Sequence, residues 1–111
     1  MGHAHPALVK AISEQAAKLM HCSNIYYTDI QAKAVKEIIE TTGFDRVFLA
    51  NSGAEANEGA IKLARKYGHQ KNEGKYRIIT AVHSFHGRTM MTVTATGQPK
   101  YQQGYEPLPA G

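Results

Sequence analysis

The sequence predicts an α/β fold in which a strand–helix–strand unit follows two helices. Three observations support this prediction. A short, nearly continuous apolar run occupies residues 45–50, a helical pattern begins near residue 53, and a second strand-like run covers residues 76–82. Two strands joined through one helix form a βαβ unit, with parallel strands and a right-handed crossover. Strands that are apolar along their whole length are typical of sheets covered on both faces.

Ahead of this unit, the N-terminal part predicts two amphipathic helices. The first covers residues 6–20, and Pro6 suits its first position, where a backbone N–H is not needed. The second begins after Thr28, which matches a capping box with Gln31, and it ends at Gly43, a favourable C-cap residue. The expected apolar faces are Leu8, Ile12, Ala16 and Leu19 in the first helix, and Val35, Ile38, Ile39 and Thr42 in the second.

Turn and cap signals bound the elements of the strand–helix–strand unit. Ser52-Gly53-Ala54-Glu55 matches a second capping box, and Gly68 is expected to end the helix that it starts. A polar loop over residues 69–75 then leads to the second strand. After Arg88 the local signal is ambiguous, because a threonine-rich segment favours a strand and yet suits a short helix. The expected buried face of the helix after Ser52 is Ala56, Ala60, Leu63, Ala64 and Tyr67.

Length and composition are those of one small globular domain. The chain has 111 residues, 42% hydrophobic and 20% charged, which excludes collagen-like, coiled-coil and wholly disordered chains. No apolar run approaches the roughly 20 residues of a transmembrane helix, and the N-terminus has no signal-peptide core. The single cysteine, Cys22, cannot form an internal disulfide. We therefore expect a cytoplasmic protein with no membrane partner.

The net charge of +4 raises the possibility of a nucleic-acid partner, but the charge distribution argues against one. Most lysines of the N-terminal part lie four residues from a glutamate, which is typical of solvated helix faces. The pairs expected from this spacing are Lys10 and Lys18 with Glu14, Lys33 with Glu37, and Lys36 with Glu40. Only residues 62–75 are locally basic, so we expect no nucleic-acid binding. A basic nucleic-acid module would show affinity that falls steeply with salt.

The segment from Asn51 to Glu58 is the best local candidate for a binding site. It joins a strand to a helix N-terminus, where unpaired N–H groups and the helix dipole favour an anion. The amides of Gly53 and Ala54, with the Ser52 hydroxyl, are therefore candidates to bind a phosphate. The segment is neither a Walker A loop nor a dinucleotide fingerprint. The alternative is a plain capped helix start, and a Glu55 carboxylate would compete with phosphate unless the capping box turns it away.

A second candidate, residues 83–89, follows the second strand. Ligands of open α/β sheets bind beyond the carboxyl ends of the strands, and both candidate loops are expected at that edge. Phe85 can stack on a planar ligand and Arg88 can clamp a carboxylate. In the alternative interpretation, Phe85 fills the core and Arg88 pairs with a surface acid. His83 and His86 are spaced like metal ligands, but no cysteine or carboxylate completes a set, so no metal site is expected.

Four segments together resemble the class III aminotransferases: residues 2–6, 23–28, 51–58 and 84–89. These are fold type I enzymes that depend on pyridoxal 5′-phosphate, and the similarity is greatest to the acetylornithine aminotransferases of arginine biosynthesis. The resemblance extends along essentially the whole chain. It implies that residues 1–111 form a single partial domain, the N-terminal part of the cofactor-binding large domain.

The resemblance also implies a role for individual residues. Gly53 and Ala54, next to Ser52, match the positions whose amides bind the cofactor phosphate. Phe85 matches the aromatic residue stacked on the pyridoxal ring. Arg88 matches the arginine that binds the carboxylate of the amino-acid substrate, and the segment after it is implied to be helical.

The reaction implied by the resemblance moves an amino group between acetylornithine, or a related ω-amino acid, and 2-oxoglutarate, in a homodimer. In the family, the Schiff-base lysine and the aspartate that holds the pyridine nitrogen lie downstream of the positions matched here. No catalytic residue is therefore expected in this chain, and neither Lys62 nor Lys100 is assigned that role. Ornithine, succinylornithine and 4-aminobutyrate stay open as amino donors. A non-catalytic α/β domain that binds a phosphorylated ligand through residues 52–54 is the alternative.

Overall fold

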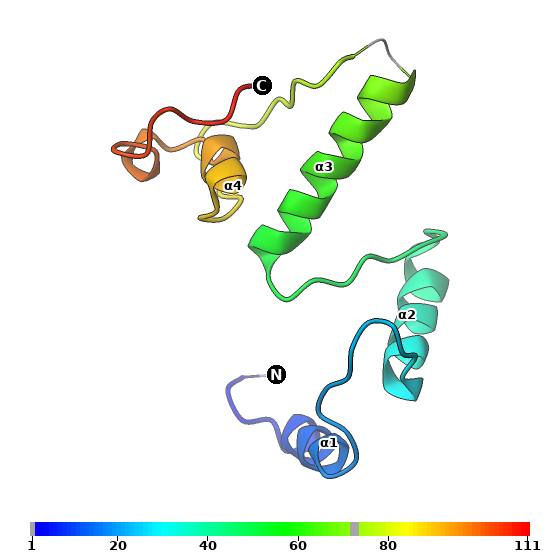
Figure 1. Ribbon diagram of the computed structural model, residues 1–111. Helices are drawn as coiled ribbons and strands as arrows, with labels where there is room; N and C mark the ends of the chain where they lie inside the picture. Colours follow the sequence, from blue (N-terminus) through cyan, green and yellow to red (C-terminus); the bar gives the residue numbers. More distant parts are fainter. Residues whose placement is uncertain (1, 72–73) are drawn as a thin grey trace. The chain divides into compact units, whose positions relative to one another are not determined.

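The computed structural model describes residues 2–71 and 74–111, which form helices joined by extended segments (Figure 1). The chain divides into two compact units, Met1–Val47 and Phe48–Gly111. Residues 72 and 73 of the predicted polar loop lie outside the described residues. The elements are α1 (Pro6–Ala16) and α2 (Asp29–Thr42) in the first unit, and α3 (Gly53–Lys71), α4 (Met90–Ala95) and the 3-10 turn η1 (Pro99–Tyr101) in the second.

Helix α1 begins where the sequence predicts. Pro6 takes the first helical position, and the His5 ring nitrogen Nδ1 accepts a hydrogen bond from the Ala7 N–H at 3.3 Å. The helix ends at Ala16, four residues before the predicted end at residue 20. Gln15 closes its last turn, because its carbonyl accepts from the Leu19 N–H at 2.9 Å and its side-chain amide donates to the Leu19 carbonyl at 2.8 Å.

Both predicted ends of helix α2 are confirmed. The Thr28 hydroxyl accepts a hydrogen bond from the Gln31 N–H at 3.3 Å. At the other end Gly43 takes a left-handed conformation with φ of 74°, and its N–H donates to the Ile39 carbonyl. A left-handed residue at this position is costly for any side chain with a Cβ, so glycine fits it.

Three surface ion pairs lie on these two helices. Lys10–Glu14 and Lys36–Glu40 are confirmed, at 3.8 and 3.7 Å. The predicted partner of Lys33 was wrong, because Lys33 pairs with Asp29 at 3.5 Å. Asp29 occupies the first turn of α2, where the helix dipole favours a carboxylate.

Helix α3 starts at Gly53, as its capping box predicts, but it does not end at Gly68. It continues to Lys71, and Gly68 is buried within it. A Cβ on Gly68 would clash with the Lys75 carbonyl oxygen. This glycine therefore permits a close approach of the chain that returns past the helix, and it is not a helix terminator.

The buried face of α3 differs from the predicted one. Ile61 and Gly68 are buried, whereas Leu63 and Tyr67 are 71% and 60% exposed, and Ala56, Ala60 and Ala64 are exposed as well. The helix packs on α4, and its small residues Ala54 and Gly68 lie against Gly87 and Lys75, which are outside α4. The prediction followed the apolar stripe and therefore missed that face.

The predicted βαβ unit is not confirmed. Within residues 2–71 and 74–111 the backbone pairs at a single parallel bridge, between Val82 and Gly97, and neither residues 45–50 nor 76–82 form a strand. The Ile78 N–H donates to the Gly111 carbonyl at 3.0 Å, so this segment meets residues that follow α4. A strand is defined by a ladder of backbone hydrogen bonds to a neighbouring strand, and residues 45–50 and 76–82 form no such ladder with each other.

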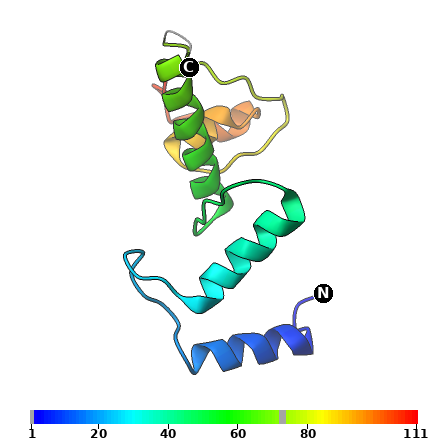
Figure 2. The same cartoon turned by 90° about the vertical axis from the view of Figure 1, so that its right-hand side faces the viewer.

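The ambiguous segment after Arg88 is helix α4, as the family resemblance implies. Thr89 caps it through a reciprocal capping box with Thr92, a local arrangement that overrides the strand propensity of threonine. Thr92, Val93 and Thr96 are buried. Figure 2 shows α4 against the side of α3 in the second unit. None of the described helices combines the length and apolar character needed to cross a membrane.

Candidate functional site

The two candidate loops predicted from the sequence meet in the second unit. Gly87 is buried against the start of α3, where a Cβ on it would lie 2.7 Å from the Ala54 Cβ. The Asn57 side-chain amide donates to the His86 carbonyl at 2.8 Å, and the Thr89 hydroxyl donates to the Glu58 carboxylate. The N-terminus of α3 and the loop around residues 84–89 therefore form one continuous surface.

The start of α3 has the geometry of an anion site. The Ser52 hydroxyl accepts from the Glu55 N–H at 3.2 Å, and the Glu55 carboxylate accepts from the Asn51 N–H at 2.7 Å. No hydrogen bond among the described residues uses the N–H groups of Gly53 and Ala54. A Cβ on Gly53 would meet nothing within 4 Å. The Glu55 carboxylate, which could compete with a bound anion, is thus held on the Asn51 N–H. The amides of Gly53 and Ala54 at the helix N-terminus stay available.

Phe85 and Arg88 lie on the surface of the same loop, which contradicts the alternative in which they serve packing and a surface ion pair. Phe85 is 56% exposed, so it does not fill the core. The ion pairs among the described residues do not include Arg88. Its guanidinium lies instead over aromatic rings, with Cζ 4.5 Å from the Tyr101 ring centroid and 5.8 Å from that of Phe85.

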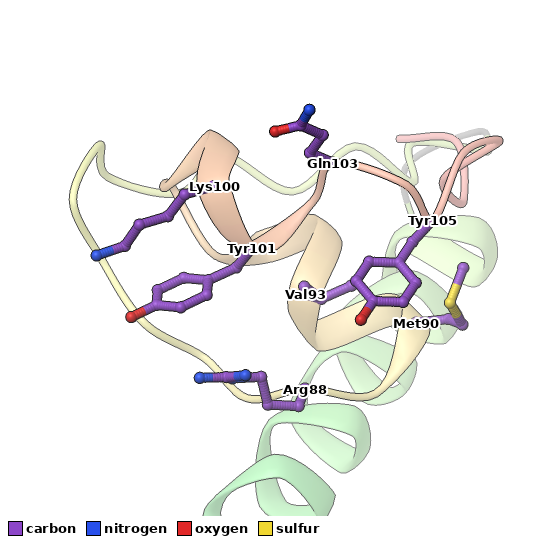
Figure 3. A pocket seen from close by; sticks show the side chains of 7 residues that line it. All are labelled: Arg88, Met90, Val93, Lys100, Tyr101, Gln103 and Tyr105. Carbon is purple, nitrogen blue, oxygen red and sulfur yellow. The ribbon is translucent and has the colours of Figure 1, made fainter.

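Tyr101 joins these two residues into one cluster. Its ring meets that of Phe85 edge to face, with centroids 6.1 Å apart. This arrangement is favourable because the positive edge of one ring approaches the negative face of the other. The cluster borders a cavity of about 300 Å³ (Figure 3). The cavity is lined by Arg88, Met90, Val93, Lys100, Tyr101, Gln103 and Tyr105.

The two histidines of this loop have structural contacts. The backbone N–H of His83 donates to the Gly97 carbonyl at 2.7 Å, and the His86 ring nitrogen Nδ1 lies 3.4 Å from the Ser84 hydroxyl. Ser84 also accepts from the Gly97 N–H at 3.2 Å. In the part of the chain that the structure describes, His, Cys, Asp and Glu residues do not gather in groups of three or more.

Sequence reasoning missed three residues of this region: Lys100, Tyr101 and Gln102. The Gln102 side-chain amide donates to the carbonyls of Val93, Thr94 and Thr96, between 2.8 and 3.3 Å, and so fixes η1 against the end of α4. The Pro99-Lys100-Tyr101 segment carries no periodic pattern. Its only signal is a lysine next to an aromatic residue, which is too common to predict a site.

Taken together, these residues define a class of site. Free amides at a helix N-terminus, beside an exposed aromatic ring and a guanidinium free of acidic partners among the described residues, suit a planar, phosphorylated ligand and a carboxylate. The class III aminotransferase family matches the chain over residues 1–111, and the chain belongs to this family. The family consists of transferases that use pyridoxal phosphate.

Individual relatives agree with this assignment. The acetylornithine aminotransferase of Caldanaerobacter subterraneus subsp. tengcongensis is 59% identical over 112 residues, covering all of this chain and 28% of its own length. The succinylornithine transaminase/acetylornithine aminotransferase of Pseudomonas aeruginosa is 52% identical and covers 96% of this chain. The chain thus spans little more than a quarter of the curated relatives that it matches.

A solved structure shows the same fold. The ornithine aminotransferase of Toxoplasma gondii, whose crystal structure has partial occupancy of pyridoxal phosphate at the active site, superposes with a TM-score of 0.87 at 28% identity. The match covers 98% of this chain and 26% of that one. The described helices and connections are therefore those of one part of a fold type I aminotransferase.

Proposed function

We propose that this chain supplies the cofactor-binding edge of a pyridoxal-phosphate-dependent aminotransferase acting on acetylornithine or a related ω-amino acid with 2-oxoglutarate. One observation carries the proposal: the capped start of α3, with Glu55 held on Asn51, lies against the loop that presents Phe85 and Arg88. The names of the curated relatives support the amino donor. A homodimer in the cytoplasm follows from the family resemblance.

The phosphate of the cofactor would bind at the start of α3. The N–H groups of Gly53 and Ala54 are available as donors, and the bare Gly53 Cα lets a phosphate oxygen approach the backbone. The Ser52 oxygen already accepts from Glu55, so its own hydrogen is free to donate to a phosphate oxygen. Three donors and the positive end of a 19-residue helix would thus face the dianion.

Phe85 and Arg88 would orient the rest of the ligand. The Phe85 ring is more than half exposed and so could stack on a pyridine ring, and the planar guanidinium of Arg88 suits a substrate carboxylate. When bound, pyridoxal phosphate supplies an electron sink for bonds broken at the amino-acid α-carbon. The residues described here bind and orient, and we assign no catalytic proton transfer to any of them.

Cofactor binding by the 111-residue chain tests the phosphate site. We expect pyridoxal phosphate to bind measurably tighter than pyridoxal in equilibrium dialysis. Gly53→Asp places a carboxylate beside the free amides. It should raise the dissociation constant of pyridoxal phosphate about tenfold or more, equivalent to about 1.4 kcal/mol of binding free energy. Ala60→Asp adds the same charge to an exposed position of α3 and should leave binding unchanged. Equal affinities for pyridoxal and pyridoxal phosphate would contradict the proposal, and so would equal effects of Gly53→Asp and Ala60→Asp on binding.

We assign the role of catalytic lysine to no residue of this chain, and a turnover assay tests that assignment. Supplied with pyridoxal phosphate, acetylornithine and 2-oxoglutarate, the 111-residue chain is expected to release no glutamate above a protein-free control. Borohydride treatment followed by peptide mass spectrometry is expected to find no single preferred lysine. Clear turnover, or cofactor trapped on one lysine, would show that a residue such as Lys62 or Lys100 has the role withheld from it.

A further inference from the structure

Two polar side chains of α3 hold the loop that precedes α4. The Asn57 side-chain amide donates to the His86 carbonyl at 2.8 Å, and the next residue, Glu58, accepts from the Thr89 hydroxyl. Both Asn57 and Glu58 are half-buried, although polar side chains are usually exposed. Helix α3 therefore bonds the loop on each side of its buried glycine, Gly87.

Two buried threonines at α4 hold the same loop from its other side. The His86 N–H donates to the Thr96 hydroxyl at 3.0 Å, and the Thr89 N–H donates to the Thr92 hydroxyl at 3.0 Å. Thr92 and Thr96 are fully buried. The backbone of His86 is thus bonded through its N–H to the end of α4 and through its carbonyl to Asn57 of α3.

Asn57 lies between the two candidate binding elements. It follows Gly53 by four residues, so it is about one helical turn from the amides of Gly53 and Ala54. The residue it bonds, His86, lies next to Phe85, whose ring is 56% exposed. A leucine has nearly the shape of asparagine but donates no hydrogen bond, so the contact depends on the amide group as well as on packing.

We propose that Asn57 is a positioning residue, which holds the His86 carbonyl and thereby keeps the Phe85 ring in place for a planar ligand whose phosphate binds at the start of α3. The proposal rests on the proposed function for the phosphate and the stacked ring, and it adds a residue that touches neither. Without the bond from Asn57, the loop has to be ordered when the ligand binds. That cost lowers the affinity for a ligand with a ring, but not for a phosphate alone.

The test compares two phosphates by NMR titration of the 111-residue chain. Pyridoxine 5′-phosphate carries the ring but no aldehyde that could react with lysines, and glycerol 3-phosphate has no ring. Asn57→Leu keeps the shape of the side chain and Asn57→Ala shortens it, and both remove the donor. Each should raise the dissociation constant of pyridoxine 5′-phosphate about fivefold, the scale of one neutral hydrogen bond, and leave that of glycerol 3-phosphate within about twofold. Gln70→Leu, which removes an amide at an exposed position of α3, should change neither constant.

Two spectroscopic signatures separate positioning from a purely structural role. In the wild-type complex the Phe85 ring current should shift the pyridine ring protons of the ligand upfield, and both Asn57 variants should reduce this shift. In the ligand-free chain the NMR order parameters of Gly87 and Arg88 should be about 0.85 in the wild type and fall toward about 0.6 in both variants.

Several outcomes would overturn the positioning role: unchanged ring shifts and order parameters, equal weakening of both phosphates, or the same effect from Gln70→Leu. Loss of the helical circular dichroism spectrum in both Asn57 variants would overturn it too, because the residue would then be purely structural. The cofactor measurement with Gly53→Asp is separate. If Gly53→Asp leaves pyridoxal phosphate binding unchanged, the proposed function fails. If it weakens binding while the Asn57 variants keep the wild-type affinity and ring shift, only the positioning role fails.

Discussion

Replacing Gly87 with alanine tests whether the two site loops depend on the close contact between Gly87 and Ala54. Gly87 has φ of 130°, a backbone region that side chains rarely adopt, and is buried. A Cβ there would lie 2.7 Å from both the Ala54 Cβ and the Thr92 hydroxyl oxygen. Backbone strain costs about 1–3 kcal/mol, and overpacking costs about 1–3 kcal/mol more. Gly87→Ala should therefore destabilise the chain by about 2–6 kcal/mol, a large share of a typical stability of roughly 5–15 kcal/mol.

The assay is urea unfolding of the 111-residue chain, followed by far-UV circular dichroism, with amide hydrogen exchange at the buried Thr92 and Thr96 as a local measure. Gly53→Ala is the matched control, because a Cβ there meets nothing within 4 Å and the residue begins a helix. We expect this control to stay within about 0.5 kcal/mol of the wild-type free energy of unfolding. If Gly87→Ala also stays within that range, the steric argument for the contact is wrong.

Two further predictions concern the ends of helices. Thr28→Ala removes the hydroxyl that accepts from the Gln31 N–H and should cost about 1 kcal/mol of helix stability. The control Thr41→Ala, inside the same helix, should be nearly neutral. Equal losses of α2 helicity in the two variants, measured by NMR, would contradict the role of Thr28 as a cap. Gln102→Ala removes an amide whose two hydrogens serve three carbonyls at the end of α4, and should cost about 1–3 kcal/mol. The exposed neighbour gives the control Gln103→Ala, and equal hydrogen-exchange rates in α4 for both variants would refute the role of Gln102.

The sequence predicted the starts of α2 and α3 because the residues responsible are neighbours in the chain. Thr28 with Gln31, and Ser52 with Glu55, act across a single helical turn, so their pattern needs no tertiary information. The candidate status of the Gly53 amide follows from the same local rule. The hydrogen bond from the Asn51 N–H to the Glu55 carboxylate is also local, although the sequence left open whether the Glu55 side chain turns away from the phosphate site.

The prediction of paired strands failed for a reason of the opposite kind. Residues 45–50 and 76–82 have strand-like composition, but a ladder needs a partner that local composition does not specify. In the structure residue 78 bonds to residue 111 and residue 82 pairs with residue 97. Likewise, the apolar stripe of α3 did not reveal its packed face, where Gly68 and Ala54 allow other segments to approach.

The sequence by itself determined the family, the helix starts and the residues that could bind a phosphate, a ring and a carboxylate, because short-range patterns and the Asn51–Glu58 and Ser84–Thr89 motifs carry that information. Only the tertiary structure decided that these two motifs meet through Gly87 and Ala54. It also brought Lys100 to the far side of the Tyr101 ring from Arg88. Contacts between residues 12 to 33 positions apart depend on the path of the chain, and no local periodicity encodes that path.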